Sequence, residues 1–449
     1  MAVLLGSKNL SVIEEVVLTS SQTYTARRTG IADVICIGAG GQGGSSGKAF
    51  PGHASMAFNG TGGGAGGYCR KRIPITAGDT FTVVVGAGGQ ANGSTLMPDA
   101  DGLKDGGAGG ETTFDHASAT ANIALDSNGG AGGVGNQTTS ASGATYAGGA
   151  GGTATGGDVN FTGGRGGTIT RSNNSANTGV FSTGGGAVAI FGAAFNGGDI
   201  NYTSAATTVA ATGGAGVGGN GGDIAYNTGT AVSTSASGGG SASGAGNGFT
   251  SSHTAAVTNT GLSAFAKTDI VMGGGRLPSH GGNGRATNTS VNGLAGNGGT
   301  GGLRAVLAGL GDSDYNSIYG GNDRPTEVIN EAITSPRIVE EQSDGPAAMY
   351  PQATGPGGGG GGACGTADNN ASNSVIAAGN GATFAGGGGA VSVVSNSELA
   401  HTTEEISSSG RGGIGGGGSG GCMLGTNASN STVEWASGGD GVVIIQYLG

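Results

Sequence analysis

A glycine pattern that binds phosphate in other folds is the first candidate for chemistry. GAGGQG at residues 38–43 matches G-x-G-x-x-G directly after an apolar run, as a dinucleotide site requires. Residues 44–48 carry no helix pattern, so no helix N-terminus would hold a pyrophosphate. A P-loop fails because Gln42 stands where glycine is needed and Ala49 where Ser or Thr binds Mg²⁺. The sequence therefore predicts no nucleotide site.

Candidate metal ligands are sparse. GGNGGD at residues 218–223 fits the start of a calcium-binding nonapeptide. Such sites need stacked tandem copies, and Ala225 stands where a large apolar residue is expected, so calcium binding stays open at this one copy. The histidines have no partner at metal-ligand spacing; they are His53, His116, His253, His280 and His401. We therefore predict no metal site and no cofactor.

Residues 303–352 concentrate acidic side chains and differ in composition from the rest of the chain. Residues 303–310 and 325–334 have helix-compatible spacing, and a protruding insertion and a solvated loop are equally good interpretations. Two carboxylates such as Glu327 and Glu331 could serve a glycosidase. Aromatic residues that would stack on sugars make up only 5% of the chain, so we predict that the protein is not an enzyme.

The four cysteines form neither a C-x-x-C pair nor a zinc pattern. Cys36 lies in an apolar run and is expected to be a buried small hydrophobe. Cys364 and Cys422 lie in similar glycine-rich contexts and could be neighbours, but reduced core cysteines are the favoured interpretation.

Composition limits how the chain can be ordered. Glycine accounts for 108 of 449 residues, and charged residues for only 10%. Glycine loses more backbone entropy on folding than any other residue, and few large side chains can offset this loss by burial. The compensation must come largely from backbone hydrogen bonds and close backbone packing. A disordered linker is disfavoured because 35% of the residues are hydrophobic.

Both ends of the chain show strand patterns. The predicted strands cover residues 16–19, 24–26, 32–37, 71–76, 79–85 and 441–447, with a hairpin turn at Gly78. Because first and last strands of a domain often pair, the ends would form one base. We predict a mainly β protein in which terminal strands form a small β-sandwich-like base carrying a large glycine-rich insertion.

Glycine blocks alternate with short polar or β-like pieces between the two ends. No strict Gly-X-Y period exists and proline numbers only nine, so collagen is excluded. We predict that the blocks are polyglycine II-type helices packed in a lattice, the alternative being loops with positive φ. A weak repeat also occurs: GGDVNF at 156–161, GGDINY at 197–202 and GGDIAY at 221–226, with GGETTF at 109–114 as a looser copy.

The terminal segments together resemble the glycine-rich domain of bacteriophage tail-fibre and virion proteins. The resemblance rests on DVICIGAGG at 33–41, GGAGGY at 63–68, ITAGDTFTVVVGAGG at 75–89 and SGGDGVVIIQY at 437–447. The middle is similar in composition to the polyglycine-rich tip adhesins of T-even-type phages. This resemblance implies a virion role in which polar segments between glycine blocks contact the host, and it carries over no individual binding residue.

The predicted organisation has an attachment segment at 1–22, a β base at 23–120 completed by 436–449, and a glycine-rich lattice at 121–435. The predicted function is a tail fibre or receptor-binding adhesin; the alternatives are a baseplate or decoration protein without receptor binding and a polysaccharide-degrading tail enzyme. Candidate receptor contacts are Tyr315, Tyr319 and Tyr350, because aromatic residues anchor interfaces. Local packing is the competing interpretation for each.

Partners follow from charge and from the resemblance. The net charge of −11 and scattered basic residues argue against nucleic acid. No apolar run is long enough to span a bilayer, and residues 1–6 lack the basic start of a signal peptide. The expected partners are other virion proteins, sister subunits, with a trimer favoured, and a host glycan or outer-membrane protein. The expected location is the virion tail, after assembly in the host cytoplasm.

Overall fold

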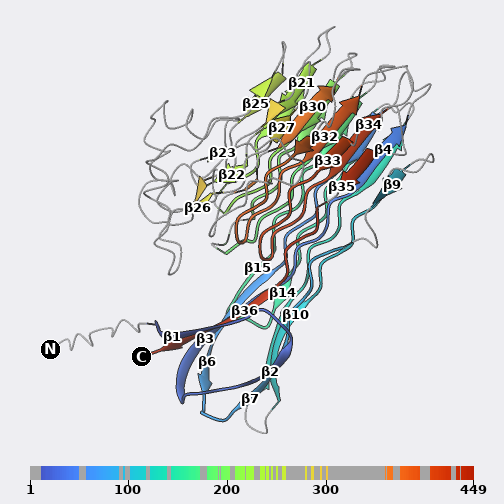
Figure 1. Ribbon diagram of the computed structural model, residues 1–449. Coiled ribbons are helices and arrows are strands. Elements are labelled where there is room, and N and C mark those ends of the chain that lie inside the picture. The colour runs from blue at the N-terminus through green and yellow to red at the C-terminus, as the bar shows by residue number, and fades with distance from the viewer. Residues whose placement is uncertain are drawn as a thin grey trace, which may run out of the picture.

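The computed structural model describes the ends, the middle and the far strands of the chain. The described residues are 12–49, 57–90, 95–96, 102–117, 122–138, 143–171, 179–190, 192, 194–202, 208–217, 219–226, 233–237, 239–241, 244–245, 249–250, 255–258, 279–280, 285–287, 294–295, 300–301, 359–360, 362–367, 375–394, 405–425, 431–434 and 436–449. All regular elements among them are strands, which confirms the mainly β class. Figure 1 shows a base near the C-terminus, extended segments running away from it, and a second group of strands at the opposite end.

Two antiparallel sheets form the base. The terminal sheet contains, in spatial order, β1 (Val12–Leu18), β36 (Val442–Leu448), β3 (Gly30–Ile37), β6 (Tyr68–Ile75) and β15 (Val159–Phe161). The second base sheet contains β14 (Ala154–Thr155), β11 (Asn122–Ser127), β10 (Thr112–Ala117), β7 (Thr80–Val84) and β2 (Gln22–Thr25). Ile445 of β36 lies opposite both Val16 of β1 and Val34 of β3. The first and last described strands therefore pair, as expected.

An apolar core of ordinary type fills the space between the base sheets. Alternate residues of β7 are buried, as expected for a strand with one face in a core. The rings of Phe81 and Phe114 stack with centroids 4.6 Å apart. The hydroxyls of Tyr24 and Tyr447 hydrogen-bond at 2.8 Å and so satisfy each other inside the core. Side-chain burial stabilises this part of the molecule.

The structure confirms the six strands predicted near the chain ends and corrects the hairpin. Gly78 lies in a turn with φ of 96°, and Asp79 Oδ2 accepts the Thr76 N–H at 2.8 Å. The flanking strands β6 and β7 enter different sheets, and β7 pairs with β2 and β10. The turn is therefore a corner between the two base sheets, because the apolar faces of both strands must meet the same core.

Four sheets make up the far end of the molecule. Distal sheet 1 contains β27 (Arg285–Thr287), β31 (Val375–Ala377), β33 (Glu405–Ser408), β35 (Ser431–Glu434) and β8 (Thr95–Leu96). Distal sheet 2 contains β28 (Leu294–Ala295), β30 (Ala363–Ala367), β32 (Ala390–Val394), β34 (Gly421–Gly425), β4 (Ser45–Ala49) and β9 (Gly102–Lys104). Distal sheet 3 contains β12 (Gly135–Thr138), β5 (Ala57–Gly60), β17 (Gly179–Ser182), β19 (Thr208–Ala211), β21 (Ser233–Ala236) and β24 (Phe249–Thr250). Distal sheet 4 contains β13 (Ala144–Tyr146), β16 (Ile169–Arg171), β18 (Ile200–Tyr202), β20 (Asp223–Tyr226) and β25 (Ala255–Thr258).

Neighbouring distal sheets pack face to face in numerical order. Strand β30 of sheet 2 contacts strand β31 of sheet 1. Between sheets 2 and 3, the Cys422 thiol donates to the Phe181 carbonyl at 3.0 Å. Between sheets 3 and 4, a small apolar cluster includes Phe181 and Tyr202, whose ring centroids are 5.3 Å apart. Two short ribbons complete the strands: β22 (Gly240–Ser241) with β23 (Gly244–Ala245), and β26 (Ser279–His280) with β29 (Thr300–Gly301).

Glycine-rich extended segments connect the base to the distal sheets, and their backbone hydrogen bonds repeat every third residue. In segment 38–44, the N–H groups of Gly38, Gly41 and Gly44 donate to the carbonyls of Gly67, Gly64 and Thr61. The N–H groups of residues 39 and 42 donate to a second segment, at Gly110 and Gly107. Those of residues 40 and 43 donate to a third, at Gly439 and Ala436. Segment 38–44 is thus bonded in three directions.

Close packing of these segments leaves no space for a Cβ atom at many of the interior glycines. A Cβ on Gly40 would lie 1.9 Å from the Gly416 carbonyl oxygen, and one on Gly66 would lie 1.9 Å from that of Gly38. Contacts below 3.0 Å require the backbone to shift. Glycine is therefore required here by the approach of neighbouring main chains, since neither residue has a positive φ.

The outer segments show which positions accept a side chain. In segment 128–134, Asn128, Ala131 and Val134 are exposed, while the intervening glycines are buried or half-buried. Segment 147–153 repeats this pattern with Ala147, Ala150 and Thr153 exposed. The period of three in exposure agrees with the period of three in hydrogen bonding, so each outer segment turns one residue in three toward solvent.

The weak sequence repeat divides between the two ends of the molecule. GGDINY and GGDIAY provide β18 and β20, which pair in parallel with Ile200 opposite Ile224 and Tyr202 opposite Tyr226. The copy at 156–161 provides β15 in the base, and the looser copy at 109–114 leads into β10 of the second base sheet. Similar sequences thus form strands in different surroundings.

Candidate functional site

The distal sheets are built from strand pairs that share one design. Among the described residues, eleven pairs of consecutive strands, each joined by residues outside the described part, have one strand in one distal sheet and the other in a neighbouring distal sheet. The pairs are β4–β5, β8–β9, β12–β13, β16–β17, β18–β19, β20–β21, β24–β25, β27–β28, β30–β31, β32–β33 and β34–β35. The residues joining each pair lie outside the described residues; SNNSANT at 172–178 and DNNASNS at 368–374 are examples. Figure 1 shows β4, β9, β21, β30, β32, β33, β34 and β35 at the end opposite β1 and β36.

The residues that the sequence proposed as contacts fall outside the described part. Tyr315, Tyr319 and Tyr350 lie there, as do Glu327 and Glu331 and the whole insertion at 303–352. Their roles stay predictions.

A ladder of Asn and Asp side chains holds distal sheet 4 to the glycine segments. Asn196 Oδ1 accepts the Arg165 N–H at 3.0 Å, and Asn220 Oδ1 accepts the Asn196 N–H at 2.8 Å. Three residues further on, Asp199 Oδ1 accepts the Thr168 N–H at 2.7 Å. Asp223 Oδ1 accepts the Asp199 N–H at 2.7 Å. Each repeat thereby satisfies a backbone donor of the repeat before it, which fixes the parallel register.

Charge is unevenly compensated along this ladder. Arg165 pairs with Asp199 at 2.6 Å, and this hydrogen bond raises the pKa of Arg165. Burial raises the pKa of the Asp223 carboxyl, and the neighbouring Asp199 charge adds to that effect. The hydrogen bond from the Asp199 N–H and the charge of Arg165 oppose the shift without cancelling it. The charged form of Asp223 is therefore disfavoured in the fold, although its side chain still accepts the Asp199 N–H.

Buried hydroxyls lie where the glycine segments become strands. Thr183 Oγ1 accepts the Gly62 N–H at 3.0 Å and donates to the Gly167 carbonyl at 2.7 Å. Thr212 repeats this arrangement, accepting the Gly184 N–H at 3.2 Å and donating to the Gly198 carbonyl at 2.6 Å. Ser237 does the same between Gly213 and Gly222. The change from threefold to strand pairing would leave these groups unpaired without the hydroxyls.

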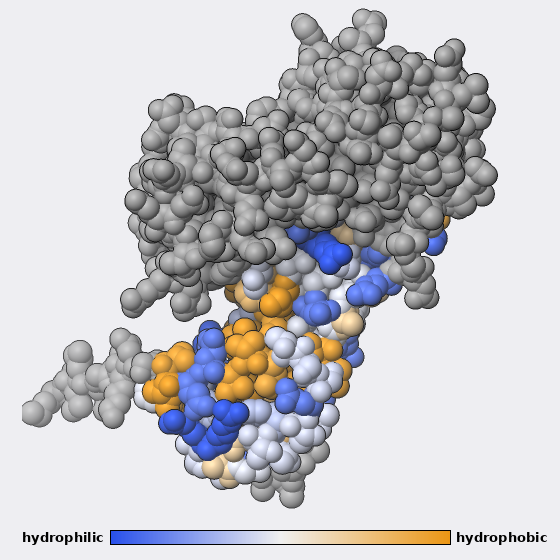
Figure 2. Space-filling view, in the orientation of Figure 1, coloured by the Kyte–Doolittle hydropathy of each residue, from blue (hydrophilic) through white to orange (hydrophobic). Residues whose placement is uncertain are grey.

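The outer face of the base is a second candidate surface. Val12, Ile13, Val17 and Ile31 are 50%, 53%, 51% and 41% exposed, and β1 is an edge strand of the terminal sheet. Figure 2 shows apolar and hydrophilic residues side by side on the base. An exposed apolar edge of this kind is suited to pairing or packing with another chain.

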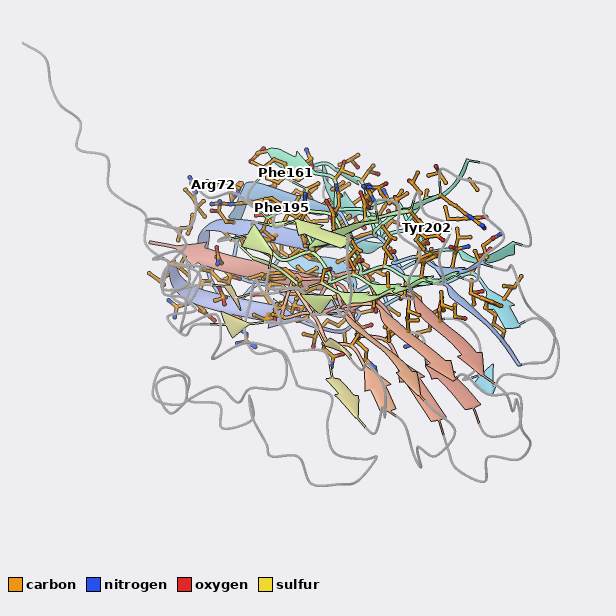
Figure 3. The ribbon with its side chains drawn as sticks, turned by 90° about the horizontal axis from the view of Figure 1, so that it is seen from above. Arg72, Phe161, Phe195 and Tyr202 are labelled. Atoms are coloured by element: carbon orange, nitrogen blue, oxygen red, sulfur yellow. The ribbon has the colours of Figure 1, made fainter. Side chains whose placement is uncertain are left out.

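A buried carboxylate anchors this outer face. Asp33 accepts hydrogen bonds from Arg72 Nε at 2.8 Å and Arg72 Nη2 at 3.0 Å, and it also pairs with Arg70. Burial would raise the pKa of the Asp33 carboxyl, but the hydrogen bonds from Arg72 and Arg70 outweigh it and lower the pKa. In Figure 3, Arg72 and Tyr202 lie far apart along the molecule, with Phe161 and Phe195 between them.

The backbone N–H groups of the glycine motif at 38–43, which resembles a phosphate-binding loop in sequence, are all used in hydrogen bonds within the fold. Every N–H of residues 38–43 donates to a backbone carbonyl of another segment, so none is available to a phosphate. In the candidate calcium motif, the side chains of Asn220 and Asp223 accept the backbone N–H groups of Asn196 and Asp199. Among the described residues, no three His, Cys, Asp or Glu side chains gather as metal ligands.

The cysteine interpretation is partly confirmed. Cys36, Cys69 and Cys422 are buried free thiols. Cys364 and Cys422 lie in the same sheet but not on adjacent strands, because Val391 of β32 stands between them in register. What the sequence did not indicate is that Cys36 lies directly opposite Cys69.

No helix in the described part of the chain is long and apolar enough to cross a membrane.

Comparison with known protein families found no family model that matches this chain. Comparison with curated proteins also found no match. The resemblance to glycine-rich phage domains therefore stays a prediction.

Proposed function

We propose that this chain is a structural, non-enzymatic component of a bacteriophage virion, acting as a tail-fibre tip or receptor-binding adhesin. The observation that carries the proposal is that the two ends of the molecule are built differently. The strands nearest both chain ends lie together in the base, whereas eleven described strand pairs lie at the opposite end. Such a layout suits attachment at one end and contact at the other.

Polar connections on a rigid support favour recognition. Binding residues are commonly carried by loops on a rigid scaffold. The segments 172–178 and 368–374 are rich in Asn and Ser, which offer hydrogen-bond donors and acceptors to a glycan or a protein loop. We assign the receptor contact to this end of the molecule, and Tyr315, Tyr319 and Tyr350 remain candidate contacts.

We also propose that the extended segments are polyglycine II-type helices. A helix with three residues per turn and no internal hydrogen bonds points its N–H groups in three directions. The three-residue period of donors in segment 38–44 and of exposure in segment 128–134 fits this geometry. A crystal structure tests it: φ and ψ near −75° and +145° would support the assignment, and values near −140° and +135° would indicate β-strands instead.

The base is the proposed attachment end. The exposed β1 edge and the apolar side chains Ile13 and Val17 suit contact with another virion protein or with sister subunits in a trimer. Assembly in the host cytoplasm and location in the virion tail belong to the same proposal.

Binding of the fluorescently labelled full chain to the host strain of its phage tests the contact end. We expect cells to be labelled, and we expect replacement of 172–178 or 368–374 by a Gly-Ser segment of equal length to reduce labelling at least several-fold. The matched control replaces residues 118–121, which join β10 and β11 in the base, and should label cells like the wild type.

Other outcomes select the other functions. If the folded wild-type chain labels no host cells, a baseplate or decoration protein without receptor binding is the better assignment. If labelled cells release oligosaccharide, and Glu327→Gln or Glu331→Gln stops the release, the chain is a polysaccharide-degrading enzyme. If the 118–121 control loses binding as strongly as the distal replacements, the contact end is wrongly assigned.

A further inference from the structure

Two cysteines lie opposite each other on neighbouring strands of the base, where the glycine segments begin. Cys36 of β3 is the register partner of Cys69 of β6, and both side chains have no exposed surface. The two thiols are close enough for each to influence the pKa of the other. Ser127 Oγ lies 3.4 Å from Cys69 Sγ and donates to the Cys36 carbonyl at 2.9 Å. Cys422, the other cysteine whose burial the structure describes, instead has Val391 and Ser46 as register partners.

The register places these cysteines within the span of a disulfide. Directly opposite residues of antiparallel strands have Cα atoms about 4.5–5.5 Å apart. A disulfide joins Cα atoms about 4.4–6.8 Å apart. Both side chains also point to the same face of the sheet, since both belong to the core of the base. A bond between them therefore needs little movement of the main chain.

We propose that Cys36 and Cys69 form a dithiol site that closes to a cross-strand disulfide when the chain meets a low-molecular-weight disulfide oxidant. The site lies where the chain between β3 and β6 leaves and re-enters the base: two positions beyond the cysteines, the Gly38 N–H donates to the Gly67 carbonyl at 3.0 Å. The bond would tie together both ends of the excursion that contains β4 and β5. Restricting that loop in the unfolded chain stabilises the folded state.

The chemistry is thiol–disulfide exchange in two steps. The Cys69 thiolate attacks one sulfur of the oxidant, forms a mixed disulfide and releases one small thiolate. The Cys36 thiolate then attacks the Cys69 sulfur and releases the second small thiolate. The two protons lost by the cysteines are taken up by the released thiolates, so one oxidant disulfide is reduced as one protein disulfide forms.

The surroundings assign the order of attack. The hydrogen bond from Cys36 lowers the pKa of the Cys69 thiol despite its burial, and Ser127 adds to the effect. Burial raises the pKa of the Cys36 thiol. Because neither sulfur is exposed, the oxidant reaches Cys69 only when β3 and β6 separate transiently. Oxidation should therefore be slow in native buffer and accelerate as mild denaturant promotes opening.

The test measures how strongly the fold favours the disulfide. The full wild-type chain is equilibrated with mixtures of reduced and oxidised glutathione, in native buffer and in denaturing urea. Free thiols are then alkylated, and peptide mass spectrometry quantifies the Cys36–Cys69 linkage. We expect the native equilibrium constant for this linkage to exceed the denatured one by roughly tenfold or more. By linkage, the oxidised chain should unfold at a correspondingly higher urea concentration than the reduced chain.

The comparison uses one sequence in two redox states, so a variant that fails to fold cannot obscure it. Cys69→Ala provides an added control in which Cys36 should form no intramolecular linkage. A native constant equal to or below the denatured one would overturn the proposal, as would a dominant linkage through Cys364 or Cys422. The dithiol site is independent of the proposed receptor contact: host-cell labelling by the reduced chain reports on that contact alone.

Discussion

The base and the glycine segments are ordered by different interactions within one chain. In the base, rings and aliphatic side chains such as Phe81 and Phe114 fill the space between two sheets. In the glycine segments, main chains approach so closely that a Cβ on Gly40 would lie 1.9 Å from a carbonyl oxygen. The base is therefore sensitive to removal of atoms and the glycine segments to their addition. Substitutions of opposite kind can test this difference.

Adding one methyl group inside the glycine segments should have the largest effect. Gly40→Ala places its Cβ against the Gly416 carbonyl, and the main chain around it is bonded in three directions. Because backbone atoms cannot rotate away, we expect a loss of about 4 kcal/mol or more in the free energy of unfolding, or failure to fold. Urea unfolding and the yield of soluble protein measure it.

A matched glycine in the base provides the control. Gly30 has no atom within 4 Å of the position a Cβ would take, so Gly30→Ala should change stability by less than about 0.5 kcal/mol. Equal losses for Gly30→Ala and Gly40→Ala would mean that close main-chain packing is not what requires glycine.

Removing atoms should damage the base next most strongly. Phe114 is fully buried and its ring stacks on Phe81. Phe114→Ala should cost about 3–4 kcal/mol through lost burial and the cavity left behind. The smaller change Phe114→Leu should cost less, because most of the volume is retained. If Phe114→Ala were tolerated within about 1 kcal/mol, the base would not depend on its side-chain core.

The junction hydroxyls should rank third. Thr212→Val keeps the shape of the side chain but leaves the Gly184 N–H and the Gly198 carbonyl without their partner. An unsatisfied buried polar group costs about 1–3 kcal/mol, so we expect a loss of about 2 kcal/mol in urea unfolding. Thr212→Ser retains the hydroxyl and should lose less. A loss for Thr212→Ser larger than that for Thr212→Val would show that the methyl group contributes more than the hydroxyl at this position.

The base should also have a specific acid sensitivity. The folded-state pKa of Asp33 lies below its ordinary value because Arg72 and Arg70 hydrogen-bond to it. Its contribution is therefore present above the ordinary carboxyl pKa and is lost as the pH falls through the lower folded value. Asp33→Asn should cost about 1 kcal/mol at pH 7, a modest figure because both arginines are partly exposed. The loss should shrink toward pH 2, as urea unfolding at several pH values would show.

Sequence reasoning succeeded where one strand carries its own pattern. The apolar run at 32–37 and the final run at 441–447 alternate or stay apolar over enough residues to indicate β3 and β36 directly. Their pairing also followed from a general expectation about chain ends. The glycine composition indicated main-chain packing in general terms, since few side chains were available for a core.

Other features depend on contacts between segments that are far apart in the sequence and could not be predicted from the sequence alone. The facing of Cys36 and Cys69 depends on the exact register of β3 against β6, which neither strand specifies alone. The hydroxyl of Thr212 matters only because two other segments end beside it. One local signal was available: in NGGAGGV at 128–134, every third residue is not glycine, and those positions are the exposed ones.

The smallest predicted effect separates the ladder from its charge. Burial raises the folded-state pKa of Asp223, so the folded chain holds its proton more tightly than the unfolded chain, and stability falls as the pH rises through that pKa. Asp223→Asn keeps an oxygen that can accept the Asp199 N–H but carries no charge. We expect a gain of about 0.5 kcal/mol at pH 7 and none at pH 3, where the wild-type carboxyl is protonated. Asp223→Ala removes the acceptor and should destabilise the chain at both pH values, because the Asp199 N–H then loses its partner. A destabilising Asp223→Asn at pH 7 would mean that the attraction of Arg165 outweighs burial, and that the carboxylate itself stabilises the distal sheets.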